Sequence, residues 1–245
     1  MDEPHSPFTD YEFLWALEHT GCVGADSASG WIPRYHLAGN GTSPSGALLL
    51  FERWNSYGEY IFDWEWARAY QHYGLAYYPK LTSAIPFTPV TVPKILGTEK
   101  EAALQQTIKT YQQDQRYSSL HGLFLNDQEL NLWLHQETLE RDSIQFHWHN
   151  RAYQSFDEFS NELVSKRRRQ VARERRQFEC HGLTTRTLTG NELTPEVADW
   201  MYQFYQATIE KKFSQFYLNR QFFETIFATM KDRVVLFLSQ NHGKP

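Results

Sequence analysis

The sequence of 245 residues has no apolar run that approaches the ~18 residues of a membrane-spanning helix. Its start, MDEPHSPF, is acidic and lacks the basic and apolar regions of a signal peptide. Only two cysteines are present, Cys22 and Cys180, far apart in sequence, and we interpret them as reduced thiols. From these absences we expect a cytoplasmic protein with no membrane span.

Familiar catalytic signatures are also missing. The sequence contains neither G-K-[ST], the end of a phosphate-binding loop, nor G-x-S-x-G, the motif around many nucleophilic serines. A phosphate loop of that type and a Ser-His-Asp nucleophile motif are therefore not predicted.

The composition is that of a globular protein, with 41% hydrophobic and 22% charged residues. The length suggests one large domain or two small ones. Aromatic residues make up 16%, which is high, and such side chains both bury large areas and line binding clefts.

Charge is unevenly distributed. The net charge is −5, yet the stretch SKRRRQVARERR at 165–176 holds seven basic residues and one acidic residue, so the remainder has 17 basic and 28 acidic residues. A remainder of −11 would repel polyphosphate over most of its surface, so any contact with nucleic acid would have to be local.

Periodicity and capping signals predict an α/β protein. The expected order for the first part is a helix, a hairpin of two strands with an Asn-Gly turn, and then alternating helices and strands; the predicted ranges are 9–20, 31–54, 63–74, 80–96, 98–112, 118–125, 127–139 and 142–153. Prolines at 86, 89 and 93 require the strand near 81–95 to be an edge, or to bulge and open out. This order matches the GNAT acyltransferase fold, in which a central strand splays from its neighbour to admit the acyl donor.

A second part is predicted to open with a long basic helix over 156–178, which begins at a capping box of Ser155 and Glu158 and stops at Gly182. A strand, two helices starting near 195 and 219, and a final strand follow. We therefore predict a first GNAT-like lobe at 1–152 and a partial second GNAT-like lobe at 153–245. The last strand runs into a turn, NHGKP, without a returning partner, so we expect this lobe to be incomplete. Either it packs on the first lobe, or another chain covers its edge, by self-association for example, or the sequence is truncated.

Four stretches together resemble the FemAB-like family of bacterial proteins; they are YIFDWEWARAYQHYGLAYYPKLTSAIPFTPVTVPKIL, IQFHWHNRAYQSFDEF, SKRRRQVARERR and KKFSQFYLNRQFF. The similarity runs in consistent order from Thr9 to Lys244. The family is labelled peptidoglycan biosynthesis or GNAT-like acyltransferase.

The resemblance implies an acyl- or aminoacyltransferase. It would move the acyl group from a thioester or aminoacyl-tRNA donor to an amine acceptor, with acyl-CoA or aminoacyl-tRNA as donor substrate and no tightly bound cofactor. Two departures favour a second hypothesis, a non-catalytic binding module that recognises an anionic glycopeptide or RNA. Val92 stands in TVPK where the resemblance leads us to expect glycine, and the chain stops at HGKP where family members continue.

Segment 77–96 is the best candidate for a donor site. Its hydroxyls and lysines could meet a phosphate-rich acyl donor near a helix N-terminus; the predicted donor-binding residues are Lys80, Ser83, Thr88, Thr91, Lys94 and Thr98. The alternative is a structural edge segment with solvated lysines.

Three residues are candidate catalytic groups. His147 and His149 would share one face of a strand, where a general base, a hydrogen-bonded structural pair or a metal site are alternatives; we predict no metal, because nothing nearby supplies a third ligand. Asp63 lies among aromatic residues, which could raise the pKa of its carboxyl and make it a base, or it could cap its helix.

The basic helix has two main interpretations, a solvated connector between lobes or an anion-binding helix. The second names Lys166, Arg167, Arg168, Arg169 and Arg173 as the anion-binding residues. Binding to tRNA would fit that interpretation, whereas sequence-specific DNA binding is not predicted, because no helix-turn-helix or zinc-finger context surrounds the run.

Overall fold

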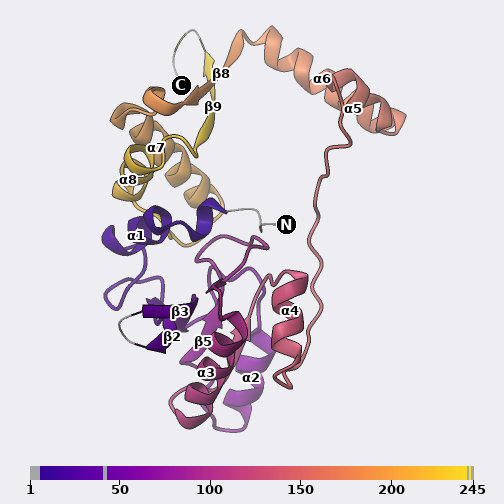
Figure 1. Cartoon of the computed structure of the whole chain (residues 1–245). Coiled ribbons are helices and arrows are strands. Elements are labelled where there is room, and N and C mark those ends of the chain that lie inside the picture. Colours follow the sequence, from indigo (N-terminus) through magenta and orange to yellow (C-terminus); the bar gives the residue numbers. More distant parts are fainter. Residues whose placement is uncertain (1–5, 41–42, 242, 244–245) are drawn as a thin grey trace. The chain divides into compact units, whose positions relative to one another are not determined.

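The computed structural model describes residues 6–40, 43–241 and 243 (Figure 1). The described chain is a mixed α/β protein with mixed and antiparallel sheets, as predicted. It forms two compact units, one made of residues up to 141 together with 195–230, the other of 142–194 together with residues from 231 onward. In the described part of the chain, every helix is too short or too polar to cross a membrane.

The described residues of the first unit form short strands and helices. Its strands are β1 (Trp31–Pro33), β2 (His36–Asn40), β3 (Ser43–Leu48), β4 (Phe51–Arg53), β5 (Lys80–Ser83), β6 (Ile95–Gly97) and β7 (Leu120–Gly122). Its helices are the 3-10 turn η1 (Pro7–Thr9), α1 (Tyr11–His19), α2 (Trp64–His72), α3 (Lys100–Gln113), α4 (Asp127–Leu134), α7 (Pro195–Lys211) and α8 (Arg220–Thr229).

The predicted hairpin at 31–54 is present and forms the centre of this unit. One arm carries β1 and β2, the other β3 and β4, and the two arms pair antiparallel. The Asn-Gly turn predicted to join them falls at 40–41, partly outside the described residues. Two sheets result, one in the order β1-β4-β5-β7 and one in the order β2-β3-β6.

The proline-containing strand opens out, as its sequence requires. β5 pairs with β4, so that Thr82 lies opposite Phe51, and β6 pairs with β3, so that Ile95 lies opposite Leu48. Between those two pairs the hairpin arm has only residues 49–50, whereas the segment that joins β5 to β6 has residues 83–94. We call residues 84–94 the excursion. Proline cannot donate to a strand ladder, which explains why the chain leaves the sheet here and returns at the Leu49 N–H, a donor to Lys94 O at 2.9 Å.

The two faces of the four-stranded sheet differ in character. β5 and β7 run parallel, with Leu81 opposite Leu120 and Thr82 opposite His121. Since side chains alternate along a strand, the two leucines share one face, where they pack with Trp133 of α4 in the hydrophobic core. Thr82 and His121 share the other face, where polar side chains lie beside the buried rings of Phe51 and Trp31, and we call it the polar face.

Helices α7 and α8 pack in the first unit. The ring of Phe222 in α8 meets Phe13 of α1 edge to face at 6.0 Å, and Asn219, the predicted N-cap of α8, both caps Phe222 N–H and donates to Thr20 O. The predicted boundary between 152 and 153 stays a prediction, but the compact units group the residues differently, because this aromatic face of α8 is buried against α1.

The second unit holds α5 (Phe156–Glu162), α6 (Ser165–Cys180), β8 (Leu183–Thr189), the 3-10 turn η2 (Gly190–Glu192) and β9 (Val235–Asn241). β8 and β9 pair antiparallel along their whole length. Ser155 caps α5, as predicted, and Gly182 has the positive φ of 68° that ends α6. The predicted single helix over 156–178 is wrong, because Leu163 and Val164 adopt extended backbone and divide it into α5 and α6.

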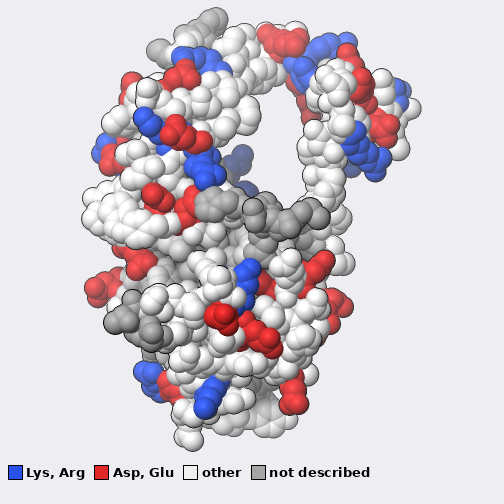
Figure 2. All heavy atoms as spheres, in the orientation of Figure 1, with Lys and Arg blue, Asp and Glu red and all other residues white. Residues whose placement is uncertain are grey.

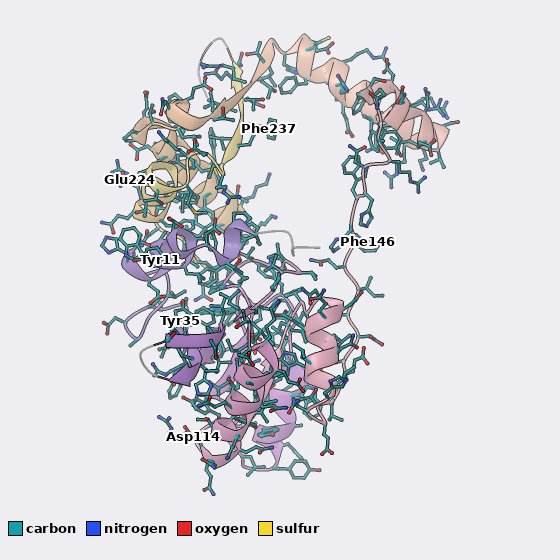
Figure 3. All side chains as sticks on the ribbon, in the orientation of Figure 1. Tyr11, Tyr35, Asp114, Phe146, Glu224 and Phe237 are labelled. Carbon is teal, nitrogen blue, oxygen red and sulfur yellow. The ribbon has the colours of Figure 1, made fainter. Side chains whose placement is uncertain are left out.

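The strand predicted at 142–153 is also wrong. Its alternating pattern is real, but the segment is extended without ladder partners in the described chain, and residues 141–150 are exposed. Phe146, 97% exposed, projects from it (Figure 3). Alternation predicts a strand only when a neighbouring strand is available to bond it.

Candidate functional site

Four charged side chains are buried together on the polar face of the four-stranded sheet. Arg53 of β4 lies opposite Lys80 of β5. Glu59 accepts from both, at 3.1 Å from Arg53 Nε and 2.9 Å from Lys80 Nζ, and Asp63 forms a second ion pair with Lys80. All four are at most 3% exposed. Two positive and two negative charges cancel, which is the condition under which buried charges are tolerated. We call these residues the charge cluster.

The charge cluster fixes the loop at 54–63, which joins β4 to α2. The Arg53 guanidinium donates to Gly30 O and Tyr57 O, and lies 3.7 Å from the centre of the Trp31 ring. Trp31 Nε1 donates to Tyr57 O as well, at 3.0 Å. Two carboxylates of the loop, Glu59 and Asp63, thus point inward, and the Tyr57 carbonyl is bonded to Arg53 and Trp31 of the sheet.

The same loop touches the excursion. Gly58 has a φ of 80°, and a Cβ at this position would lie 2.8 Å from the ring of Phe87, so only glycine lets the two segments approach. Phe87 itself stacks on Tyr217 at 4.7 Å. The excursion is therefore packed, through Phe87, against the loop at 54–63 and Tyr217.

Asp63 behaves differently from both sequence interpretations. It occupies the N-cap position of α2, but its carboxylate makes no capping bond. It accepts instead from Lys80, Ser56 and Tyr77. Burial alone would raise the pKa of this carboxyl, but Lys80 and the two hydroxyls outweigh burial and lower it. The raised pKa that a base interpretation needs is absent, and Asp63 is a charged anchor.

Sequence reasoning passed over His121, which lies beside this anchor on β7. Its Nε2 is 2.7 Å from Ser119 Oγ and 3.4 Å from Tyr77 Oη, and Tyr77 donates to Asp63. Burial, followed by the nearby Lys80, lowers the pKa of His121 to about 4, with Asp63 opposing. The imidazole is therefore neutral at pH 7. The available signal was the parallel strand SSLHGLFL, which puts a histidine on the polar face next to Thr82.

The predicted donor-binding residues are not brought to one surface. Lys80 belongs to the charge cluster, and Lys94 is 1% exposed, paired with Glu129 at 3.5 Å and donating to Phe124 O at 2.7 Å. Burial lowers the pKa of Lys94, with Glu129 opposing. The alternative of solvated lysines is therefore wrong for both.

The four predicted hydroxyl residues lie at different points of the segment. Ser83 ends β5, fully buried, and its Oγ has no hydrogen-bond partner among the described residues. Thr88 and Thr91 lie on the excursion, where Thr88 Oγ1 donates to Pro86 O at 3.0 Å. Thr98 lies beyond β6 and bonds to Ser45 O at 3.4 Å rather than capping α3.

Glu129 holds the far end of the excursion. Its Oε1 accepts the backbone N–H groups of Lys94 and Ile95, at 2.5 and 2.6 Å. At the near end, Leu123 N–H donates to Ser83 O at 3.0 Å. Both ends are thus bound to fixed elements, α4 and the residue after β7.

His147 and His149 lie in the second unit, in the extended segment. Their rings are nearly parallel with centres 6.1 Å apart, and His147 Nε2 is 2.7 Å from Gln145 Oε1, so the three side chains share a side as the alternation predicted. Within residues 6–40, 43–241 and 243, no three His, Cys, Asp or Glu side chains gather as a metal site requires.

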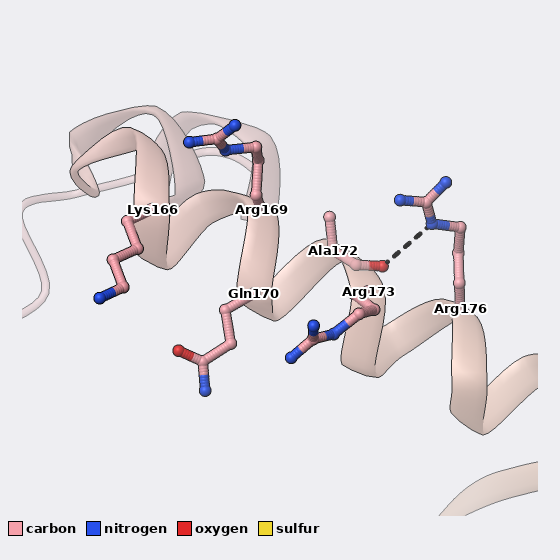
Figure 4. Close-up of a pocket in the computed structure, with 6 residues that line it drawn as sticks. All are labelled: Lys166, Arg169, Gln170, Ala172, Arg173 and Arg176. Atoms are coloured by element: carbon pink, nitrogen blue, oxygen red, sulfur yellow. Dashed lines mark hydrogen bonds between the residues drawn. The ribbon is translucent and has the colours of Figure 1, made fainter.

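The basic run forms a stripe along one side of α6. Figure 2 shows basic side chains gathered over the part of the chain that holds α5 and α6. A shallow groove is lined by four cations with Gln170 and Ala172; the cations are Lys166, Arg169, Arg173 and Arg176 (Figure 4). We call these four the α6 stripe.

Only part of the predicted anion-binding set belongs to the stripe. Arg167 bonds to Gln170 at 2.9 Å, and Arg168 bonds to Leu163 O and Asn161. Neither is among the residues that line the groove. Arg176, at one more helical turn, joins it. A spacing of three or four residues places cations on one face, about 5 Å apart along the axis.

These features define a mixed α/β protein that has a buried charge cluster on β4, β5 and the loop at 54–63, an interrupted strand after β5, and a basic helix, α6. The family model described as peptidoglycan biosynthesis/recognition, FemAB-like, matches residues 1–245. The chain belongs to the FemAB-like family. Neither the curated proteins nor the solved structures include a significant match to it.

Removal of one charge from the cluster tests its structural role. Glu59→Gln leaves Arg53 and Lys80 facing a single carboxylate, and we expect unfolding free energy to fall by about 3–5 kcal/mol in urea denaturation. The matched control is Glu65→Gln, whose side chain is 83% exposed in its pair with Arg68 and whose loss should be within error. Equal effects of the two substitutions would contradict the structural role.

The depressed pKa of His121 predicts a pH dependence of stability. The unfolded chain binds a proton near pH 6.5, while the folded imidazole resists it down to about 4. His121 therefore contributes stability above pH 6.5, which is lost as pH falls toward 4, by up to about 3 kcal/mol. The free energy of unfolding, measured by denaturation, should fall more steeply between pH 6.5 and 4.5 in the wild type than in His121→Gln. The difference between the two proteins at pH 8, where the imidazole is neutral in both states, measures the effect of the substitution on packing. Parallel curves would contradict the burial argument.

Proposed function

We propose that this FemAB-like protein is a cytoplasmic acyl- or aminoacyltransferase of peptidoglycan metabolism. It would move an acyl group from a thioester or aminoacyl-tRNA donor to an amine, on a GNAT-like first lobe. The family description, peptidoglycan biosynthesis/recognition, supports the metabolic setting. The single observation that carries the proposal is the excursion between β5 and β6, where a central strand leaves the sheet beside a parallel neighbour.

The excursion has the features that an extended acyl donor needs. It opens next to the parallel pair of β5 and β7, and its ends are bound while 84–94 departs from the ladder. Backbone groups released from a ladder can bond a donor chain of amides, such as pantetheine or an aminoacyl ester. Thr88, Thr91, Thr98 and Ser83 remain proposed contacts to this donor, with Lys80 and Lys94 as positioning residues.

The chemistry would be direct attack by the amine on the donor carbonyl, without a covalent enzyme intermediate. The attacking amine must lose a proton as the thiolate of coenzyme A or the ribose oxygen of tRNA leaves. His121 can relay that proton, through Ser119 Oγ, to the leaving group, and its low pKa ensures that it does not keep the proton. Tyr77 keeps its hydroxyl proton, because burial and Asp63 raise its pKa, and it donates a hydrogen bond to Asp63, so it acts as a positioning residue beside His121. His147 and His149 remain alternative proposed bases.

The proposal is tested by steady-state transfer assays with radiolabelled acyl-CoA or aminoacyl-tRNA and an amine-bearing peptidoglycan precursor. We expect transfer by the wild type, and a fall in kcat of about 10²-fold or more in His121→Gln with little change in KM. His72→Gln, an exposed residue of α2, is the matched control and should retain activity. If neither acyl-CoA nor aminoacyl-tRNA supports transfer, the proposal is overturned.

A second candidate function is favoured by the α6 stripe, which has the spacing of an anion-binding surface. A binding module would use it to hold a phosphate-bearing chain. Its affinity would fall as the salt concentration rises, because the release of counterions on binding then becomes less favourable. The bonds of the stripe leave its charges on the helix surface: Arg169 bonds to Ser165 O and Arg176 to Ala172 O.

The stripe predicts the effect of charge reversal. Arg169→Glu should weaken binding of a single-stranded RNA 20-mer at least tenfold and reduce its salt dependence, because it reverses a groove-lining charge. Arg167→Glu makes the same change two residues away but outside the groove, and should have a clearly smaller effect. Fluorescence anisotropy across a salt series measures both. Equal losses would show that only total charge matters.

A further inference from the structure

The outer face of the loop at 54–63 and the start of α2 carries a set of exposed aromatic rings. The residues and their exposed fractions are Trp54 54%, Tyr57 50%, Tyr60 47%, Phe62 45% and Trp64 37%. We call these five the aromatic platform. Exposed apolar side chains are common singly, but three of these rings, Tyr57, Phe62 and Trp64, are in mutual contact, and contiguous rings mark a binding surface.

The platform is the reverse of a normal packing pattern. Along this segment Ser56, Glu59 and Asp63 are buried, while the rings between them face outward. A chain that only needed a stable loop would bury the rings and expose the carboxylates. Here the charge cluster holds the backbone, so the rings are freed from any role in the core.

The rings also have a defined arrangement. Phe62 and Trp64 are nearly parallel, at 12° with centres 5.4 Å apart, and Tyr57 inclines against Trp64 at 58° and 5.3 Å. Tyr60 has a φ of 60°, a left-handed backbone that a bulky residue rarely adopts. Such strain persists where surrounding structure enforces it, and it gathers at ligand sites.

Charge on the platform narrows the ligand class. Residues 54–64 contain only two charged side chains, Glu59 and Asp63, and both are buried. At its margin, exposed Glu65 is paired with Arg68, so that these two charges cancel, and Arg141 donates to Phe62 O at 3.2 Å. The rings themselves therefore match an uncharged partner. Two of its rings are tyrosines and two tryptophans, which combine an apolar face with a polar edge, whereas the aliphatic side chains that favour an apolar peptide are confined to half-buried Ile61.

We propose that the aromatic platform binds a pyranose ring of an uncharged saccharide. The C–H face of a pyranose is flat and carries partial positive charge, which suits the negative face of an aromatic ring, while its hydroxyls reach the polar edges. The inference deepens the proposed function and rests on it for the setting, since it names the sugar chain of the acceptor as the part recognised. Donor binding and transfer are not needed for the platform to hold sugar.

Titration of the full chain with an N-acetylglucosamine tetramer, followed by tryptophan fluorescence and calorimetry, tests the inference. We expect saturable binding, at least tenfold weaker in Trp64→Ala and in Phe62→Ala, with unchanged melting temperatures. Phe213→Ala is the matched control, because Phe213 is 98% exposed but lies outside the platform. It should bind as the wild type does.

The outcomes separate this inference from the proposed activity. Saccharide binding that depends on Trp64, in a protein that transfers no acyl group, supports the platform and overturns only the transferase proposal. Absence of binding, or binding equally strong in Trp64→Ala, overturns the platform even if transfer is observed. Self-association that is lost in Trp64→Ala, without saccharide binding, would assign the rings to a second copy of the chain and also overturn it.

Discussion

The structure of the first unit depends on the burial of Arg53 and Lys80 against Glu59 and Asp63. Taking charges out of water is costly, so such a cluster persists only when every member is paired and hydrogen-bonded. Loss of one member leaves another as an uncompensated buried charge. The cluster connects strands β4 and β5 to the loop at 54–63, whose last residue, Asp63, directly precedes α2. The loop is thus held to the sheet by ion pairs and hydrogen bonds rather than by apolar packing of its own side chains.

This arrangement gives three layers with different tasks. The apolar face of the four-stranded sheet, with Leu81 and Trp133, supplies the core. The polar face carries the charge cluster and the neutral imidazole of His121. The outer surface carries aromatic rings that the core does not need. A site for an amine acceptor with an attached sugar would use the second and third layers together, with the excursion beside them for the donor.

Much of the element order could be predicted from the sequence, because it depends on local signals. Ser155 and Asn219 cap their helices as capping rules predict, and the prolines at 86, 89 and 93 identify the place where the strand opens. Burial of charge could not be predicted, because Lys80 and Lys94 are indistinguishable from solvated lysines until their partners, distant in sequence, are known. His121 escaped notice for the same reason. The alternation at 142–153 failed because a strand needs a neighbour, which a local pattern does not specify.

The fixed ends of the excursion have a consequence for variation within such a fold. Glu129 supplies, from a helix, the bonds that a neighbouring strand would otherwise give to Lys94 and Ile95, and Ser83 is tied to Leu123. The intervening residues can then change in number without moving either end, since doubling a loop costs only about 0.6 kcal/mol in closure entropy. A single helix glutamate thus separates the length of the excursion from the stability of the sheet, because the bonds that hold its far end do not depend on the residues in between.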